Sequence, residues 1–199
     1  MGTLLSADEF LVAPQPDDVR RELVRGEVRS MTPAGGAHGR AGANLYDALM
    51  PFVRARRLGV CFFDGTGFLL PLPPELQRRS RDGRPRDTVR SPDVAFVRAD
   101  RVPAEGFGPG WVRLAPDFAA EVLSPSETTS DTEEKLADYR AAGTALLWVV
   151  DPAKRLATVY AAEAPTRWLR GGDTLDGGGV VPGFTIAVDA LFEDVAAEG

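Results

Sequence analysis

Cysteine, histidine and lysine are scarce in this chain of 199 residues, which has one cysteine, one histidine and two lysines. Cys61 alone cannot form a disulfide within the chain, and its apolar neighbours indicate a buried structural thiol and not a reactive one. The sequence has no Cys and His ligands at metal-binding spacing, no Gly-x-Ser-x-Gly elbow and no Walker loop. These absences argue against a Cys/His zinc protein, an α/β-hydrolase and a P-loop nucleotidase.

Long apolar runs are also missing. No stretch approaches the roughly 20 apolar residues of a membrane-spanning helix, and residues 1–11 lack the basic and then apolar pattern of a signal peptide. We therefore expect a cytoplasmic protein without membrane contact. The length fits one domain over residues 1–199, with residues 1–18 as an N-terminal arm.

Acidic residues outnumber basic ones, which gives a net charge of −6 and a pI near 4.9. A protein with this overall charge repels a polyanion. Six arginines nevertheless gather between residues 78 and 90, among them Arg79, Arg81, Arg84 and Arg86. Two interpretations of this loop stay open: it contacts the phosphates of a nucleic acid, or it is a solvated surface loop.

A short apolar run from Phe118 to Leu123 predicts a strand that is buried on both faces. Glu121 interrupts this run. Because a buried carboxylate is unfavourable unless a cation or hydrogen-bond donors compensate it, we expect a metal, a Lys or an Arg nearby. A buried Glu–Arg pair is the simpler alternative.

The next segment predicts a helix that begins near a capping box at Asp131 and runs to about Ala142. Lys135 lies on the flank of the apolar stripe of Leu136 and Tyr139, so its side chain should lean toward the core. A cation in the first turns gains nothing from the helix dipole. The chain otherwise uses arginine, with 21 Arg against two Lys, so a lysine at this position indicates a specific role.

A further strand is predicted over residues 91–97, opened by Pro92. It carries Asp93 on one face. Two strands that each carry a carboxylate, followed by Lys135 on the next helix, would form a small acidic pocket with one ammonium at its edge. Magnesium prefers oxygen sites of this kind and keeps several waters in them.

These residues resemble the Uma-type restriction endonucleases, a mostly bacterial family in the PD-(D/E)XK nuclease superfamily. The resemblance covers roughly residues 22–192 and depends on these motifs: Pro92-Asp93, Glu121-Val-Leu-Ser-Pro-Ser126, Asp131 with Glu134-Lys135-Leu136, Tyr139, and Leu147-Trp-Val-Val-Asp-Pro152. The position two after Glu121, where the superfamily motif has its lysine, is Leu123. The resemblance implies that the lysine has moved to the following helix, where it corresponds to Lys135.

The same resemblance implies a metal-dependent endonuclease that hydrolyses phosphodiester bonds in nucleic acid, with DNA as the expected substrate. Asp93, Glu121 and the backbone carbonyl of Val122 would hold Mg²⁺ or Mn²⁺, and Lys135 would orient the attacking water. Many PD-(D/E)XK enzymes act as dimers, so we expect a two-fold homodimer by analogy.

Two more residues are candidates for auxiliary roles. Glu27 follows a predicted hairpin turn at Arg25-Gly26; by resemblance it would be an auxiliary acid near the metal, and a solvated acid is the alternative. His38 lies at the start of a predicted helix over residues 38–57, on its inward face. It either caps the helix or bonds in the core, or it acts near the phosphate as a proton shuttle.

The fold expected is α/β and restriction-endonuclease-like: a central mixed, twisted β-sheet flanked by the helices of His38 and Lys135, with an additional β-hairpin layer. Further strands are predicted over residues 59–64, 67–72, 145–150 and 156–161, and a short helix capped by Asp189 over residues 189–196. A non-catalytic nucleic-acid or protein-binding module on this scaffold is the second hypothesis. The acidic pI favours that module, whereas the intact set of two acids and a lysine favours the enzyme.

Overall fold

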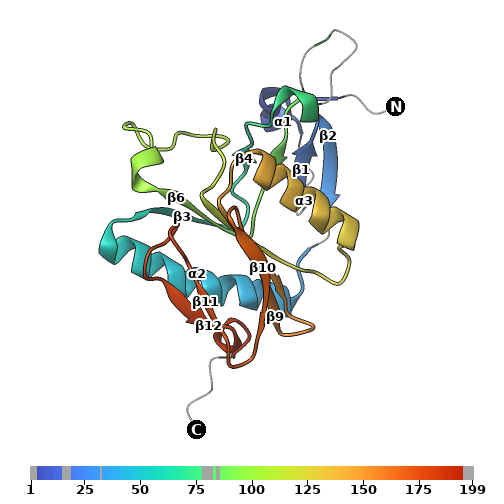
Figure 1. The fold of residues 1–199 in the computed structure, drawn as a ribbon. Helices are drawn as coiled ribbons and strands as arrows, with labels where there is room; N and C mark the ends of the chain where they lie inside the picture. Colours follow the sequence, from blue (N-terminus) through green and yellow to red (C-terminus); the bar gives the residue numbers. More distant parts are fainter. Residues whose placement is uncertain (1–3, 15–18, 32, 78–82, 84–85, 195–199) are drawn as a thin grey trace.

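A six-stranded mixed sheet forms the centre of the computed structural model, which describes residues 4–14, 19–31, 33–77, 83 and 86–194 (Figure 1). The strand order is β10-β9-β8-β7-β6-β3. The strands are β3 (Gly59–Phe63), β6 (Val94–Arg98), β7 (Phe118–Val122), β8 (Leu146–Asp151), β9 (Leu156–Ala161) and β10 (Ala164–Arg170). β7 and β8 are parallel, and the other neighbours in this sheet are antiparallel. A parallel pair needs a crossover, and helix α3 (Thr129–Ala141) provides it.

The two long helices cover opposite faces of this sheet (Figure 1). Because side chains alternate along a strand, Phe96 points to the core under α2 (Gly36–Arg56), whereas its neighbour Ala95 points to the core under α3. Trp148 is the largest fully buried side chain and lies on the α2 side. A C-terminal hairpin of β11 (Thr174–Asp176) and β12 (Thr185–Ala187) adds Leu175 and Ile186 to the same core.

A second, antiparallel sheet of four strands adjoins α3, in the order β2-β1-β5-β4. Its strands are β1 (Arg20–Val24), β2 (Glu27–Met31), β4 (Phe68–Leu69) and β5 (Val89–Arg90). The β1–β2 turn has left-handed backbone at Arg25 and Gly26, with φ of 49° and 83°. Helix α1 (Ala7–Val12) packs on this sheet: Phe10 is buried and stacks on Trp111 at a ring-centroid distance of 5.4 Å. Part of the expected N-terminal arm is thus a packed helix.

Short 3₁₀ helices complete the fold: η1 (Pro74–Leu76), η2 (Ala99–Arg101) and η3 (Asp189–Leu191). No helix among the described residues is long and apolar enough to cross a membrane. The expected α/β architecture, with a central mixed sheet flanked by helices, is confirmed.

Three local details differ from the sequence-based expectations. The N-cap of α3 is Thr128, and the carboxylate of Asp131, the third residue of the helix, accepts the Thr128 N–H. The capping box therefore lies three residues earlier than expected. The segments on either side of residues 64–66 join different sheets, because β4 pairs with β5 and not with β3. The helix expected from Asp189 is only the short η3, with Val188 as its cap.

Candidate active site

Asp93 lies where the chain leaves the four-stranded sheet at β5 and enters the six-stranded sheet at β6. Its side chain is buried, and its Oδ2 accepts a hydrogen bond of 2.7 Å from the Val122 N–H. The Asp93 N–H in turn donates to the Ala120 C=O at 3.1 Å. The paired register of β6 and β7 reaches Val94 and Ala120. One step further along each strand come Asp93 and Glu121, so the two acids are adjacent.

Glu121 lies on the α3 side of β7, where Lys135 and Tyr139 of α3 bind its two oxygens. The Lys135 ammonium is 3.1 Å from Oε2, and the Tyr139 hydroxyl donates to Oε1 at 2.8 Å. All three side chains are buried. The Lys135 ammonium also lies 2.7 Å from Oε1 of Glu127, in the loop before α3. The expectation that Lys135 leans toward the core is confirmed.

Glu121 is a buried acid whose negative charge is only partly compensated by Lys135 and Tyr139. Burial, with the nearby Asp93 and Glu22 carboxylates, raises the pKa of Glu121 to about 7, although Lys135 and Tyr139 act in the opposite direction. Burial by itself lowers the pKa of Lys135, but the carboxylates of Glu121, Glu22 and Glu127 outweigh this effect and raise the pKa above its ordinary value. Burial also raises the pKa of Tyr139. The ammonium and the phenol therefore keep their protons.

These residues border a cavity of about 410 Å³ that lies between the two sheets and the ends of α2 and α3. Six ionisable side chains are part of its lining: Arg20, Glu22, His38, Asp64, Asp93 and Lys135. Val122 lines it as well, whereas Glu121 does not and is reached through Lys135. The volume is in the range of small-ligand sites.

Two nitrogen-bearing side chains converge on the second oxygen of Asp93. Arg20 donates to Oδ1 at 3.1 Å, and the His38 Nε2 is 3.1 Å from the same atom. Arg20 also lies 2.5 Å from Asp64, just after β3, and donates to the Ser91 C=O. His38 comes from the first turns of α2, so one carboxylate links both sheets and the helix on the opposite face.

Behind the cavity, an ion-pair network fixes α3 to the four-stranded sheet. Arg90 donates to Glu22 at 2.9 Å and to Asp138 at 2.9 and 2.6 Å, and all three are almost fully buried. Burial disfavours the charged guanidinium, but the two carboxylates more than offset this and raise the pKa of Arg90. The other Glu22 oxygen accepts the Ser91 N–H at 2.9 Å. This network holds the segment before Asp93 and the helix of Lys135 in one arrangement.

The Uma2 family model, described as "Putative restriction endonuclease", matches residues 7–189. The chain belongs to the Uma2 family. A crystal structure of a protein from Anabaena variabilis, described as a "putative nuclease belonging to DUF820", has the same fold, with a TM-score of 0.77 and 18% sequence identity. That match covers 94% of this chain and 97% of the Anabaena chain. No curated protein matches the chain. The family resemblance read from the motifs is thereby confirmed.

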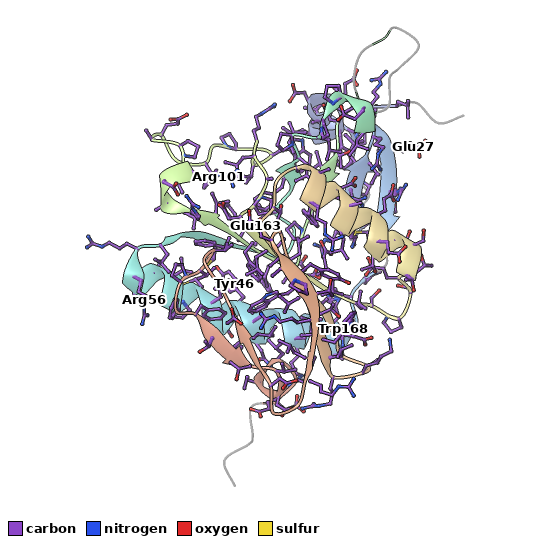
Figure 2. The ribbon with its side chains drawn as sticks, in the orientation of Figure 1. Glu27, Tyr46, Arg56, Arg101, Glu163 and Trp168 are labelled. Atoms are coloured by element: carbon purple, nitrogen blue, oxygen red, sulfur yellow. The ribbon has the colours of Figure 1, made fainter. Side chains whose placement is uncertain are left out.

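The remaining candidates in this Uma2 protein lie elsewhere or outside the described residues. Glu27 is exposed at the start of β2 and does not line the cavity; Figure 2 shows it at the margin of the molecule. Arg79, Arg81 and Arg84 lie outside the described residues. Arg86 is half-buried, lies 3.8 Å from Glu9 and does not line the cavity.

Sequence reasoning missed Glu22 and Arg20, which the fold of the Uma2 chain brings from β1 into the cavity wall. Glu22 is 2% exposed and stands beside the buried Leu23 and Val24. An acid within an apolar strand was the signal that singled out Glu121. At Glu22 this signal is weaker, because Arg20 and Arg21 precede it in β1 and only Leu23 and Val24 are apolar. Arg20 carried no comparable signal, because its role depends on a contact with Asp93 at a sequence distance of 73.

A divalent cation fits this Uma2 site by charge and by ligand type. Among the described residues, no three His, Cys, Asp or Glu side chains are arranged as a ready-made metal cluster. Magnesium, however, is commonly bound by one or two carboxylates together with water and substrate phosphate. Burial is the main cause of the raised pKa of Glu121, and the charges of Asp93 and Glu22 add to it. An added cation would act against both effects.

Proposed function

We propose that this Uma2 protein is a metal-dependent endonuclease of the PD-(D/E)XK type that hydrolyses phosphodiester bonds in nucleic acid, with DNA as the substrate. The observation that carries the proposal is the ion pair of Lys135 with Glu121, 3.1 Å long, beside Asp93 at the wall of a cavity. These are the two acids and the displaced lysine that the motifs predict. A purely structural Glu–Lys pair would not need a second carboxylate and an open cavity beside it.

Asp93, Glu121 and the backbone carbonyl of Val122 are the residues that would hold Mg²⁺ or Mn²⁺. When bound, such an ion polarises a phosphoryl oxygen and lowers the pKa of a coordinated water. We assign to Glu22, and not to Glu27, the part of the auxiliary acid, because Glu22 lines the cavity and Glu27 does not.

Lys135 is the residue that places the attacking water in this proposal. Its ammonium keeps its charge because the carboxylates around it raise its pKa, so it can hold a water and offset the negative charge that develops on the phosphate. Arg20 is exposed to the cavity and bonds to Asp93 and Asp64. Its guanidinium is well placed to bind a substrate phosphate when a metal ion, and not Arg20, compensates the charge of those carboxylates.

The second hypothesis is a non-catalytic binding module on the same scaffold. It is favoured by the net charge of −6 and by the pairing of cavity arginines with acids, since Arg20 and Arg29 both bind carboxylates. Both hypotheses predict contact with a partner at the cavity. They differ in whether the acids and Lys135 are needed for a chemical change in that partner.

A plasmid nicking assay with and without Mg²⁺ or Mn²⁺ separates the two. We expect cleavage that depends on the metal and that disappears in Asp93→Asn and in Glu121→Gln, both of which keep the side-chain volume. Glu27→Gln is the matched control and should cleave as the unmodified protein does. Cleavage that persists in both site variants would refute the proposed site. Binding of DNA without any cleavage, over a range of metals and substrates, would favour the binding module.

A further inference from the structure

The six-stranded sheet has two outer strands, and they differ in how they are protected against pairing with another strand. β10 carries Pro165, a shift of register between Ala164 and Arg167, and a second arginine, Arg170. Prolines, irregularities and charges are the usual means of blocking an open edge. β3, at the other end, reads Gly-Val-Cys-Phe-Phe and has an unbroken register with β6. It has none of these protections.

The outer side of β3 presents backbone groups that no described strand takes up. The Ala99 N–H donates to the Leu58 C=O, and the next position back, Arg98, directs its N–H to Asp117 on the opposite side of β6. Because successive residues of a strand point their backbone groups to opposite sides, even-numbered residues of β3 bond to β6. Gly59 and Cys61 therefore point their N–H and C=O groups outward. Phe63 does the same, although its C=O already accepts a hydrogen bond of 3.1 Å from the Thr66 hydroxyl.

We propose that two copies of this chain pair through β3, antiparallel and around a two-fold axis at Cys61, to give one continuous sheet across the dimer. Two-fold symmetry requires a self-complementary surface. With Cys61 on the axis, each outward-pointing residue faces another outward-pointing residue: Cys61 faces the partner's Cys61, and Gly59 faces the partner's Phe63. The whole of β3 then takes part in the pairing.

The side chains fit this register. Phe63 is 39% exposed although its ring packs on Tyr46 of α2 at 5.0 Å. In the paired arrangement its exposed part lies over Gly59 of the partner subunit, which has no side chain to cover its own backbone. Aromatic residues opposite edge glycines stabilise sheets in this way. Val60 lies opposite the partner's Phe62, a pair of the apolar type that favours strand association.

Charges at the two ends of β3 support the same partner. Arg57, just before the strand, is exposed and makes no ion pair with any described residue. Asp64, just after the strand, is 46% exposed and lines the cavity. In the antiparallel register the partner's Arg57 adjoins Asp64, so opposite charges meet at each end. Each subunit would thereby place a cation at the edge of the other's cavity.

Size-exclusion chromatography with light scattering, over a wide range of protein concentration, tests the proposal directly. We expect a particle of twice the 21.3 kDa chain mass. Phe63→Lys should raise the dissociation constant by about tenfold or more, because it loses a central aromatic contact and adds like charges. Trp168→Lys, at an aromatic residue of the other outer strand that is 65% exposed (Figure 2), is the matched control and should remain dimeric.

Two further experiments keep the test valid if a single variant fails to fold. One swaps the charges of Arg57 and Asp64, and the other measures amide hydrogen exchange in the unmodified protein. Arg57→Glu should weaken the dimer, and Arg57→Glu with Asp64→Lys should restore it. Amide exchange at Cys61 and Phe63 should slow as concentration rises. A monomer at every concentration overturns the proposal, as does a dimer that Phe63→Lys and Arg57→Glu leave unchanged. None of these measurements uses cleavage, so their outcome and that of the nicking assay are independent.

Discussion

Lys135 is the residue at which the enzymatic and the structural interpretation of the site differ most. Its side chain is 6% exposed, and its ammonium binds Glu121 at 3.1 Å and Glu127 at 2.7 Å. Lys135→Met removes the charge and keeps most of the volume, whereas Lys135→Ala also leaves a cavity. We expect both to lower metal-dependent cleavage by on the order of a hundredfold or more, the effect of losing one preorganised charge.

The burial of Lys135 adds a stability effect that the sequence did not suggest. Breaking a buried ion pair costs about 3–5 kcal/mol, but here Glu121 can take up a proton and keeps its bond from Tyr139. We therefore expect a loss of about 2–4 kcal/mol for Lys135→Met at pH 8, and a smaller loss near pH 5.5, where Glu121 is protonated more readily.

Lys135→Arg separates charge from chemistry. A guanidinium offsets the charge of Glu121, but it is planar, larger and almost never deprotonated. We expect Lys135→Arg to recover part of the stability in urea unfolding and little of the cleavage in the nicking assay. If Lys135→Met unfolds more easily and still cleaves at the original rate, the lysine is only structural. The attacking water would then have to be activated by a second metal or by His38.

Three further predictions concern the metal, the pH and the buried network. Mg²⁺ or Mn²⁺ should raise the melting temperature through binding linkage, and Asp93→Asn with Glu121→Gln should abolish that rise; an unchanged response would place the ion elsewhere. Because the folded pKa of Glu121 is about 7 and its ordinary value 4.5, its contribution to stability is full below pH 4.5 and is lost as the pH rises to 7. The loss amounts to about 3 kcal/mol, so stability relative to Glu121→Gln should fall over this window, and parallel pH profiles would contradict the shift. Arg90→Met should cost about 3–5 kcal/mol in urea unfolding because Glu22 and Asp138 lose a buried partner; a loss below 1 kcal/mol would show that Arg90 is dispensable.

Much of the site could be read from the sequence because each key residue breaks a local pattern. Glu121 interrupts an apolar strand, and Lys135 is one of two lysines in a chain of 21 arginines. Such anomalies are visible without coordinates, since burial of a charge is unfavourable unless it is compensated. The helix and strand positions around them followed from periodicity, and the family match over residues 7–189 confirmed the family. The same logic does not single out Glu22, because two arginines precede it in residues 20–24 and no apolar run is interrupted there.

What the sequence by itself determined is therefore the type of fold, the family, and the acids and lysine that stand out against their surroundings, because alternation and burial act over a few neighbouring residues. What only the tertiary structure decided is which distant groups meet. Arg20 and His38 share one oxygen of Asp93, and Arg90 joins Glu22 to Asp138. The open edge of β3 was likewise invisible, because whether a strand is central or outer depends on the order of the whole sheet. The residues in these contacts are far apart in the sequence. The local sequence pattern around one residue of such a pair does not specify the other.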